Sequence, residues 1–316
     1  MNKTLIEWVR NPDGSQGYTW NPVTGCLNHK NGLCKGGGFP CYAYRLANGR
    51  LRQRYLANHE WTTEVTIHDK PALLDPFYPR FWPERLNEPY HLGGGQFGMA
   101  TIPKGIFVCD MGELFGDWVR REWQEDIFQV INNCPQHRFY LLTKQPQNLI
   151  LWSPFPENCW VGVTACNARA AFEADSYLAN IKARVKYASL EPLLKSVEFP
   201  AGVLACLARH NDWLIIGAMT GRRSELVQLS SRYPDLTLMP WGRIWTLQPK
   251  REWVAEIVNT ADKAKIPVFL KDNLQPLFPE AFKDREDRES APSPFFMSDG
   301  EYRQEMPGER ERVESV

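Results

Sequence analysis

The sequence lacks an excess of charge of either sign. Lys plus Arg and Asp plus Glu both number 37 among 316 residues, so the formal net charge is zero. The protein as a whole therefore neither attracts nor repels nucleic acid or an anionic membrane. Any contact with a polyanion has to be confined to one patch of the surface.

Long apolar runs are also missing. No segment approaches the roughly 18 apolar residues of a membrane-spanning helix. The first residues, MNKTLIEWVRNPDG, contain no apolar stretch followed by a small-residue cleavage site of the kind that marks a secreted protein. We expect a cytoplasmic protein that does not bind membranes, in which the eight cysteines are reduced thiols.

Three of these cysteines lie close together in one glycine-rich stretch. Cys26, Cys34 and Cys41 fall within TWNPVTGCLNHKNGLCKGGGFPCYAYRLA. Three thiolates are one too few for a closed structural metal site, whereas a reactive site keeps one coordination position open for a substrate or cofactor. The stretch therefore indicates a reactive metal centre.

Two other readings of the cysteines are possible. His29 can supply the fourth ligand of a Cys3His zinc site, although zinc-binding cysteine pairs are usually separated by about two to four residues. Here seven and six residues separate the cysteines. The cysteines can also be small buried apolar residues, but the Asn, His, Lys and Gly residues around them describe a polar loop.

Short β-branched or aromatic runs alternate with amphipathic segments along the chain. Near-continuous apolarity predicts strands buried on both faces, hence a parallel sheet covered by helices. The pattern predicts an α/β fold with a parallel partial (β/α) barrel, and a doubly wound open sheet is the second choice. The strands are expected at 105–110, 138–144, 160–166, 185–191, 213–221 and 267–273, after a first strand near 18–21, with helices at 119–134 and 251–264.

Polar residues follow several of these runs, at the edge of the sheet where barrel enzymes place their active sites. Asp110 and Glu113 follow the second strand, and Lys144 ends the third. Such residues also cap helices and form turns, which is the alternative explanation for each of them. Several of them at one rim, beside a three-thiol loop, favour a site.

The order of these segments resembles a known family. TWNPVTGC with two further cysteines and CYA, EVTIH at 64–68, GELF at 112–115, FYLLTKQP, VGVT, SLEPLL and LIIGAMTG follow one another between about Thr19 and Lys271. Together they resemble a phage-associated family of unknown function with a three-cysteine radical-SAM-like motif. A more distant similarity is to spore photoproduct lyase.

The resemblance implies a partial parallel barrel that carries a 4Fe-4S cluster on the three cysteines. It also implies that S-adenosylmethionine binds the fourth iron and is cleaved to a 5'-deoxyadenosyl radical with one electron, from a donor such as flavodoxin or ferredoxin. Asp110 and Glu113 then correspond to contacts of the methionyl amine, and Lys144 is the candidate catalytic side chain. The candidate ribose and adenine contacts are Ser189, Glu191, Gly217 and Thr220.

The cysteine spacing departs from the common radical-SAM pattern. That pattern has three and then two residues between its cysteines, so the segment KGGGFP at 35–40 reads as an insertion. Its three glycines can fold a longer loop back, because glycine reaches backbone angles that other residues avoid.

Two basic stretches bear on the substrate. A group of four arginines follows the cysteines and can bind phosphates, although a solvated helical face is the commoner explanation. Aromatic and basic residues also alternate between Trp241 and Trp253, where exposed rings can stack on bases. A nucleic acid or nucleotide substrate is therefore one expectation. The four arginines are Arg45, Arg50, Arg52 and Arg54.

For the domain organisation we expect one barrel over 1–281, with the cysteine loop at 26–41 and a Pro-, Gly- and aromatic-rich excursion or lid at 71–104. Residues 282–316 mix dense charge with few core residues, which predicts a flexible tail.

Overall fold

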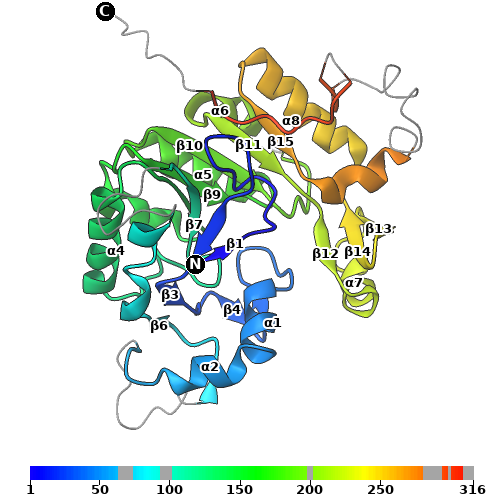
Figure 1. Ribbon diagram of the computed structural model, residues 1–316. Coiled ribbons are helices and arrows are strands. Elements are labelled where there is room, and N and C mark those ends of the chain that lie inside the picture. Colours follow the sequence, from blue (N-terminus) through cyan, green and yellow to red (C-terminus); the bar gives the residue numbers. More distant parts are fainter. Residues whose placement is uncertain (63–73, 93–101, 198–201, 280–293, 298–299, 309–316) are drawn as a thin grey trace, which may run out of the picture. The chain divides into compact units, whose positions relative to one another are not determined.

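The computed structural model describes residues 1–62, 74–92, 102–197, 202–279, 294–297 and 300–308 (Figure 1). The chain divides into two compact units: unit 1 comprises 1–163 and 180–184, and unit 2 comprises 164–179 and 185–316. The EVTIH segment at 64–68 and residues 93–101 of the predicted excursion lie outside the described residues. Among the described helices, none is both long and apolar enough to cross a membrane.

An eight-stranded sheet forms the centre of the fold, as the apolar runs predict. The first two strands pair antiparallel, the paired strands that follow run parallel, and the strand order does not close into a ring. The predicted α/β class with a largely parallel, partial barrel that does not close is thereby confirmed. The order is β1 (Asn2–Lys3), β2 (Tyr18–Trp20), β7 (Gly105–Val108), β8 (Arg138–Thr143), β9 (Cys159–Thr164), β10 (Val185–Leu190), β11 (Trp213–Ile216) and β15 (Val268–Leu270).

In unit 1, the strands are buried because both of their faces are apolar. All four residues of β7 and all six of β9 are buried. Helix α4 (Arg121–Asn133), predicted from its amphipathic pattern, buries Trp123, Ile127 and Ile131. This β7–α4–β8 unit brings the ends of two adjacent parallel strands to one edge, beside the segment that carries the cysteines.

Small elements surround the cysteine segment in unit 1. Strand β3 pairs with β6, and β4 pairs with β5, both in antiparallel fashion. The short helices α1 and α2 lie between β5 and β6 in the sequence. Their bounds are β3 (Val23–Thr24), β4 (His29–Lys30), β5 (Leu33–Cys34), α1 (Tyr42–Asn48), α2 (Arg52–Ala57), β6 (Arg80–Phe81) and the short 3-10 helices η1 (Pro83–Arg85), η2 (Pro89–His91) and η3 (Pro146–Trp152).

Residues 74–92 of the predicted excursion pack into unit 1. Arg80 is fully buried, and its guanidinium donates to the carbonyl oxygens of Asp75 and Tyr78 at 3.0 and 2.7 Å. The Trp82 indole donates to Thr24 Oγ1 at 2.8 Å. These contacts make this part of the excursion a component of the core around the cysteine segment.

In unit 2, three parallel strands are covered by helices. The other elements are α5 (Ala168–Ala179), α6 (Val203–His210), α7 (Arg223–Ser230), α8 (Arg251–Lys263), η4 (Asp272–Leu277) and a small antiparallel sheet of β12 (Met219–Gly221), β14 (Ile244–Gln248) and β13 (Thr237–Trp241). Helix α8 matches its predicted range, and α7 contacts the small sheet (Figure 1).

The run at 213–221 is two strands, whereas the sequence predicts one. β11 ends at Ile216, and β12 turns away to pair with β14. The Asn273 side chain accepts from Ala218 N at 3.0 Å and donates to Ala218 O at 3.0 Å, so it takes both backbone groups that a continuing strand would offer. This break comes from a residue far along the chain, and the local apolar pattern carries no sign of it.

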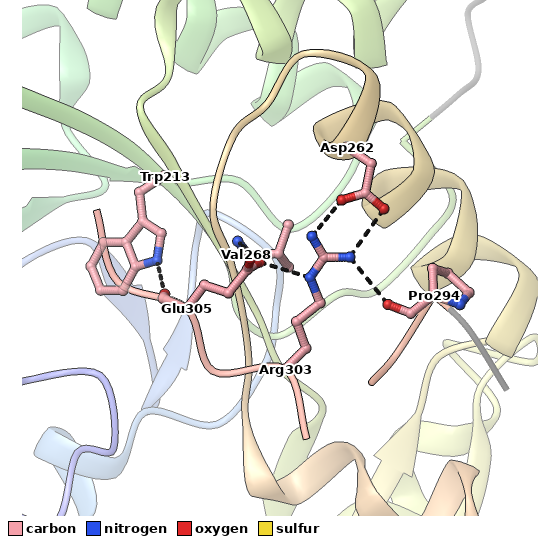
Figure 2. A network of polar contacts seen from close by, with 6 residues as sticks. All are labelled: Trp213, Asp262, Val268, Pro294, Arg303 and Glu305. Atoms are coloured by element: carbon pink, nitrogen blue, oxygen red, sulfur yellow. Dashed lines mark hydrogen bonds and ion pairs between the residues drawn. The ribbon is translucent and has the colours of Figure 1, made fainter. Parts of the chain in front are cut away.

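Part of the predicted tail packs on unit 2, contrary to the expectation of a flexible segment (Figure 2). The guanidinium of Arg303 is bonded to the Asp262 carboxylate and to Glu305 Oε2. Glu305 in turn accepts from Val268 N at 2.9 Å and, through its carbonyl, from the Trp213 indole at 2.9 Å. Charged residues build this contact, which is why a composition argument misses it.

Candidate functional site

The cysteine segment begins at a close approach between two backbone stretches of unit 1. Gly25 N donates to Met111 O at 2.9 Å, and Glu113 N donates to Gly25 O at 3.3 Å. Gly25 has φ +89°, and a Cβ atom there would lie 2.5 Å from Tyr78 O, so only glycine fits. Cys26 is thereby held next to the loop that follows β7.

Cys34 lies on a hairpin that is formed by β4 and β5 and has a two-residue turn. The turn is Asn31-Gly32, with φ values of 50° and 79°, and it places His29 opposite Cys34. Asn-Gly is the preferred pair for such a turn because both residues tolerate positive φ. This Asn-Gly signal in the sequence could have revealed the hairpin.

The KGGGFP insertion folds back onto this hairpin. Cys34 N donates to Phe39 O at 2.9 Å, and Cys41 N donates to Gly32 O at 2.8 Å. Cys41 then becomes the N-cap of α1, and its Sγ accepts from Tyr44 N at 3.5 Å. The longer spacing therefore still returns Cys41 to the side of the hairpin that carries Cys34.

The three thiols form no disulfide, and the charge of the Cys41 thiolate acts on both Cys26 and Cys34. Burial, then the Glu113 carboxylate and the Cys41 thiol, raise the pKa of Cys26 to about 12. Burial also raises the pKa of Cys34, with Lys144 opposing the shift. Both thiols are therefore protonated at neutral pH without a metal, and a metal that binds them has to displace protons.

The thiol arrangement bears on the kind of metal group. Among the described residues, no three His, Cys, Asp or Glu side chains gather in a way that could hold a single metal ion. In an iron–sulfur cluster each cysteine bonds a different iron atom, so three thiols together leave one iron of a 4Fe-4S cluster without a protein ligand. The donor set fits such a cluster.

His29, the fourth ligand of the zinc alternative, is held by aromatic packing. Its ring lies 4.9 Å from the Tyr44 ring and 5.3 Å from the Phe77 ring, and its Nδ1 accepts from Gly32 N at 3.4 Å. Burial lowers the pKa of His29, so the imidazole is neutral. These contacts give the side chain a structural role in the hairpin.

Glu113 is a buried carboxyl group that joins the loop after β7 to the end of β8. It accepts from Thr143 Oγ1 at 2.6 Å, from Lys144 N at 3.0 Å and from Phe115 N at 3.2 Å. Burial raises its pKa although these donors oppose the shift. Most of its hydrogen-bonding capacity is thus used inside unit 1, and its predicted contact with a cofactor amine stays a prediction.

Asp110 links the same loop to the start of α1. Its Oδ1 accepts from Asn21 Nδ2 at 2.6 Å, and the Tyr42 hydroxyl donates to its carbonyl oxygen and, at 3.3 Å, to Oδ2. Burial raises the pKa of Asp110. Lys144 Nζ lies 5.9 Å from the centre of the Phe39 ring in the insertion. Unit 1 therefore brings the three cysteines together with Asp110, Glu113 and Lys144.

In unit 2, residues at the ends of three adjacent strands converge. Glu191, after β10, forms an ion pair with Lys271, after β15. A Cβ atom on Gly217, after β11, would lie 3.1 Å from both of these side chains. Asn273, which the sequence analysis missed, lies 3.4 Å from the same point.

The other two candidates of unit 2 lie apart from that group. Ser189 is buried within β10, where its carbonyl accepts from Ala165 N at 2.8 Å. Thr220 is in the small sheet opposite Thr246. Their predicted roles toward a cofactor remain untested.

The protein is therefore of the α/β class and carries a loop with three thiols at the ends of its strands. Residues 3–230 match the family described as protein of unknown function DUF5131. Because the match covers most of the chain, the chain belongs to the DUF5131 family. The family resemblance in the sequence is thereby confirmed.

Comparison with curated proteins gives no match. Three solved structures are similar, each with a TM-score of 0.45. Spore photoproduct lyase complexed with dinucleoside spore photoproduct shares 12% identity over 85% of this chain and 75% of that one. A cysteine mutant shares 13% over 88% and 77%, and a double mutant with bound AdoMet and dinucleoside spore photoproduct shares 10% over 82% and 76%.

Glu113 makes a prediction for the dependence of stability on pH. Its pKa is raised above the ordinary value of 4.5, so above that pH the folded protein holds a proton that the unfolded chain has lost. The free energy of unfolding then falls as pH rises, by up to about 1.4 kcal/mol per pH unit, until the raised pKa is passed. Glu113→Gln removes this contribution. Urea unfolding at several pH values should show that the variant's free energy of unfolding increases relative to that of the wild type as pH rises.

The exposed carboxylate Glu157 provides the control, because Glu157→Gln removes a charge at the surface of the same unit. Profiles for Glu113→Gln and the wild type that stay parallel from about pH 4.5 to about pH 8 would contradict the raised pKa.

Proposed function

We propose that the protein is a radical-SAM enzyme. Cys26, Cys34 and Cys41 hold a 4Fe-4S cluster, and the iron without a cysteine ligand binds S-adenosylmethionine. The observation that supports the proposal is that three unpaired thiols lie in one segment of unit 1, within electrostatic influence of Glu113 and Lys144 at the ends of two parallel strands. Reduced thiols suit the cytoplasm, where we expect the protein to act.

When bound, the cluster supplies the one electron that cleaves S-adenosylmethionine to a 5'-deoxyadenosyl radical. The chain's own residues bind the cluster and S-adenosylmethionine and orient them for the reaction. Lys144 lowers the pKa of both Cys26 and Cys34 through its charge, which favours the thiolates that bind iron. Asp110 is our candidate acceptor for the methionyl amine. We retain Lys144 as the candidate catalytic side chain.

The remaining cofactor contacts are proposed from the resemblance alone. They are Ser189, Glu191, Gly217 and Thr220. A Gly217 backbone with no side chain leaves room for a planar group to approach, since any Cβ would press on Glu191 and Lys271.

A zinc-binding Cys3His module that associates with nucleic acid is the alternative from another class. It requires His29 as a ligand, so metal content and the His29 variant separate it from the enzyme. A relic of the enzyme that has kept the fold without the cluster is a third possibility, and it predicts no bound metal.

Replacing any one of the three cysteines with Ala should abolish the cluster. Protein reconstituted anaerobically with iron and sulfide should hold four irons and four sulfides per chain, whereas Cys26→Ala, Cys34→Ala and Cys41→Ala should hold almost none. Iron and sulfide analysis and the visible absorption spectrum measure this directly. Circular dichroism checks that each variant is folded.

Two control variants sharpen the result. His29→Ala and Cys206→Ala, the latter a half-buried cysteine on α6, should bind as much iron as the wild type. Colourless protein with one zinc per chain that is lost in His29→Ala would establish the zinc alternative instead.

We further propose that the substrate is a nucleic acid or nucleotide. The β13–β14 hairpin of unit 2 supports this, because its turn carries Gly242 at φ +55° and an exposed Arg243 between Trp241 and an Ile244 that is 41% exposed. The Arg223 guanidinium also lies 5.2 Å from the Trp245 ring. Aromatic rings on one strand pair, with Arg243 at its turn and Arg223 on the neighbouring helix α7, suit bases and phosphates.

Removing two side chains at this turn should weaken binding to a single-stranded oligonucleotide. Trp241→Ala with Arg243→Ala removes one stacking platform, worth about 1–3 kcal/mol, and about one unit of the salt slope. Fluorescence anisotropy at several salt concentrations measures both quantities, with Arg209→Ala on α6 as the control. Wild-type protein that binds neither DNA nor RNA at low salt would rule this substrate class out.

A further inference from the structure

Charge is distributed unevenly around the cysteine segment. Between Gly14 and His59 the sequence has no Asp or Glu, although the whole chain is neutral. Six basic residues fall in the same stretch, and all six are exposed. We call them the basic face: Lys30, Lys35, Arg45, Arg50, Arg52 and Arg54.

Most of this charge is available to a partner. Arg50 and Arg52 form no ion pair with a described residue. The Lys35 ammonium donates to a neutral carbonyl, Leu27 O, at 3.2 Å, and Arg54 lies 5.9 Å from the Trp82 ring. Neither contact neutralises the charge.

The basic face is built onto the cysteine loop. Lys35 directly follows Cys34, and Lys30 lies in the same hairpin. Helices α1 and α2 (Figure 1) bury Ala47 and Tyr55 in one apolar cluster, against which Cys26 and Cys41 also pack. The four arginines lie on these helices or directly beside them. The six basic residues therefore belong to the same hairpin and helices that carry or pack against the three thiols.

We propose that the basic face is the docking surface of an acidic electron-transfer protein of the flavodoxin class. This inference rests on the proposed function, in which each cleavage of S-adenosylmethionine consumes one electron from outside. One electron leaves the reduced flavin of the donor, which is oxidised by one electron, and it is taken up at the cluster held by the cysteines. No bond forms between the two proteins.

The location follows from the physics of electron transfer. Its rate falls steeply with distance, so a donor has to dock where the cysteine loop reaches the surface. A nucleic acid substrate has no such need to approach Cys34 from the side of Lys30 and Lys35. Transient redox complexes bury little area and depend on complementary charge for their association rate, which the six exposed basic residues supply.

Charge reversal tests the proposal. Arg50→Glu with Arg52→Glu changes two exposed residues, and Lys182→Glu with Arg184→Glu is the matched control, because these two exposed basic residues belong to the same unit and lie outside the cysteine segment and its two helices. Binding of a bacterial flavodoxin is measured by calorimetry on protein with and without the cluster. The rate at which flavodoxin reduces the cluster is measured by stopped flow. Cleavage of S-adenosylmethionine driven by dithionite is measured in parallel.

At low salt the Arg50/Arg52 variant should bind flavodoxin about tenfold or more weakly than the wild type does. Flavodoxin should also reduce the variant's cluster about tenfold or more slowly. The difference should shrink as salt is raised, because screening removes the wild type's advantage. Dithionite is a small reductant that needs no docking surface, so the cleavage it drives should be equal in all three proteins. The control pair should behave as the wild type throughout.

Different outcomes identify different failures. Equal flavodoxin binding by the wild type and the Arg50/Arg52 variant, or none by either, overturns the docking proposal. Loss of single-stranded DNA binding in that variant with unchanged flavodoxin binding overturns it in favour of a nucleic acid on this face. A wild type that binds flavodoxin but does not cleave S-adenosylmethionine with dithionite supports docking and refutes the proposed function.

Discussion

The arrangement of the candidate site depends on the backbone approach between Gly25 and the loop after β7. The hydrogen bonds from Gly25 N to Met111 O and from Glu113 N to Gly25 O join two chain segments that are far apart in sequence. A side chain at Gly25 would press on Tyr78 O, and one at Gly112 would lie 3.1 Å from Gly25 O. This approach places the Cys26 thiol beside Glu113, whose carboxyl group then anchors the loop to Thr143 and Lys144 at the end of β8.

The second constraint is electrostatic. The Cys26 and Cys34 thiols and the Glu113 carboxyl are held where burial raises their pKa values, and Lys144 is the cation that opposes the shift in each case. Burial also raises the pKa of core thiols such as Cys109 and Cys159, so a raised pKa does not by itself mark a site. What distinguishes Cys26 and Cys34 is the nearby Lys144 charge, which favours the thiolates that we propose bind a metal group.

The sequence predicts the main sheet well because burial on both faces leaves a direct pattern, seen in β7, β9 and β10. It predicts poorly where one distant side chain decides the outcome, as when Asn273 ends β11 by bonding Ala218. The packed segment around Arg303 was missed because ion pairs, not apolar residues, hold it. At the site, the position of Asp110, Glu113 and Lys144 at strand ends predicted that they would lie near one another. It did not predict that the Glu113 carboxyl oxygens would accept hydrogen bonds from Thr143 and two backbone N–H groups.

The central claim is that the cysteine loop holds a cluster with one iron open to S-adenosylmethionine. Electron paramagnetic resonance of the anaerobically reconstituted, dithionite-reduced protein tests this most directly, when spectra are recorded with and without S-adenosylmethionine. The account predicts the signal of a singly reduced 4Fe-4S cluster whose g-values shift when S-adenosylmethionine is added, because the open iron gains a ligand. A cluster signal that S-adenosylmethionine leaves unchanged, or no cluster signal at all, would contradict it.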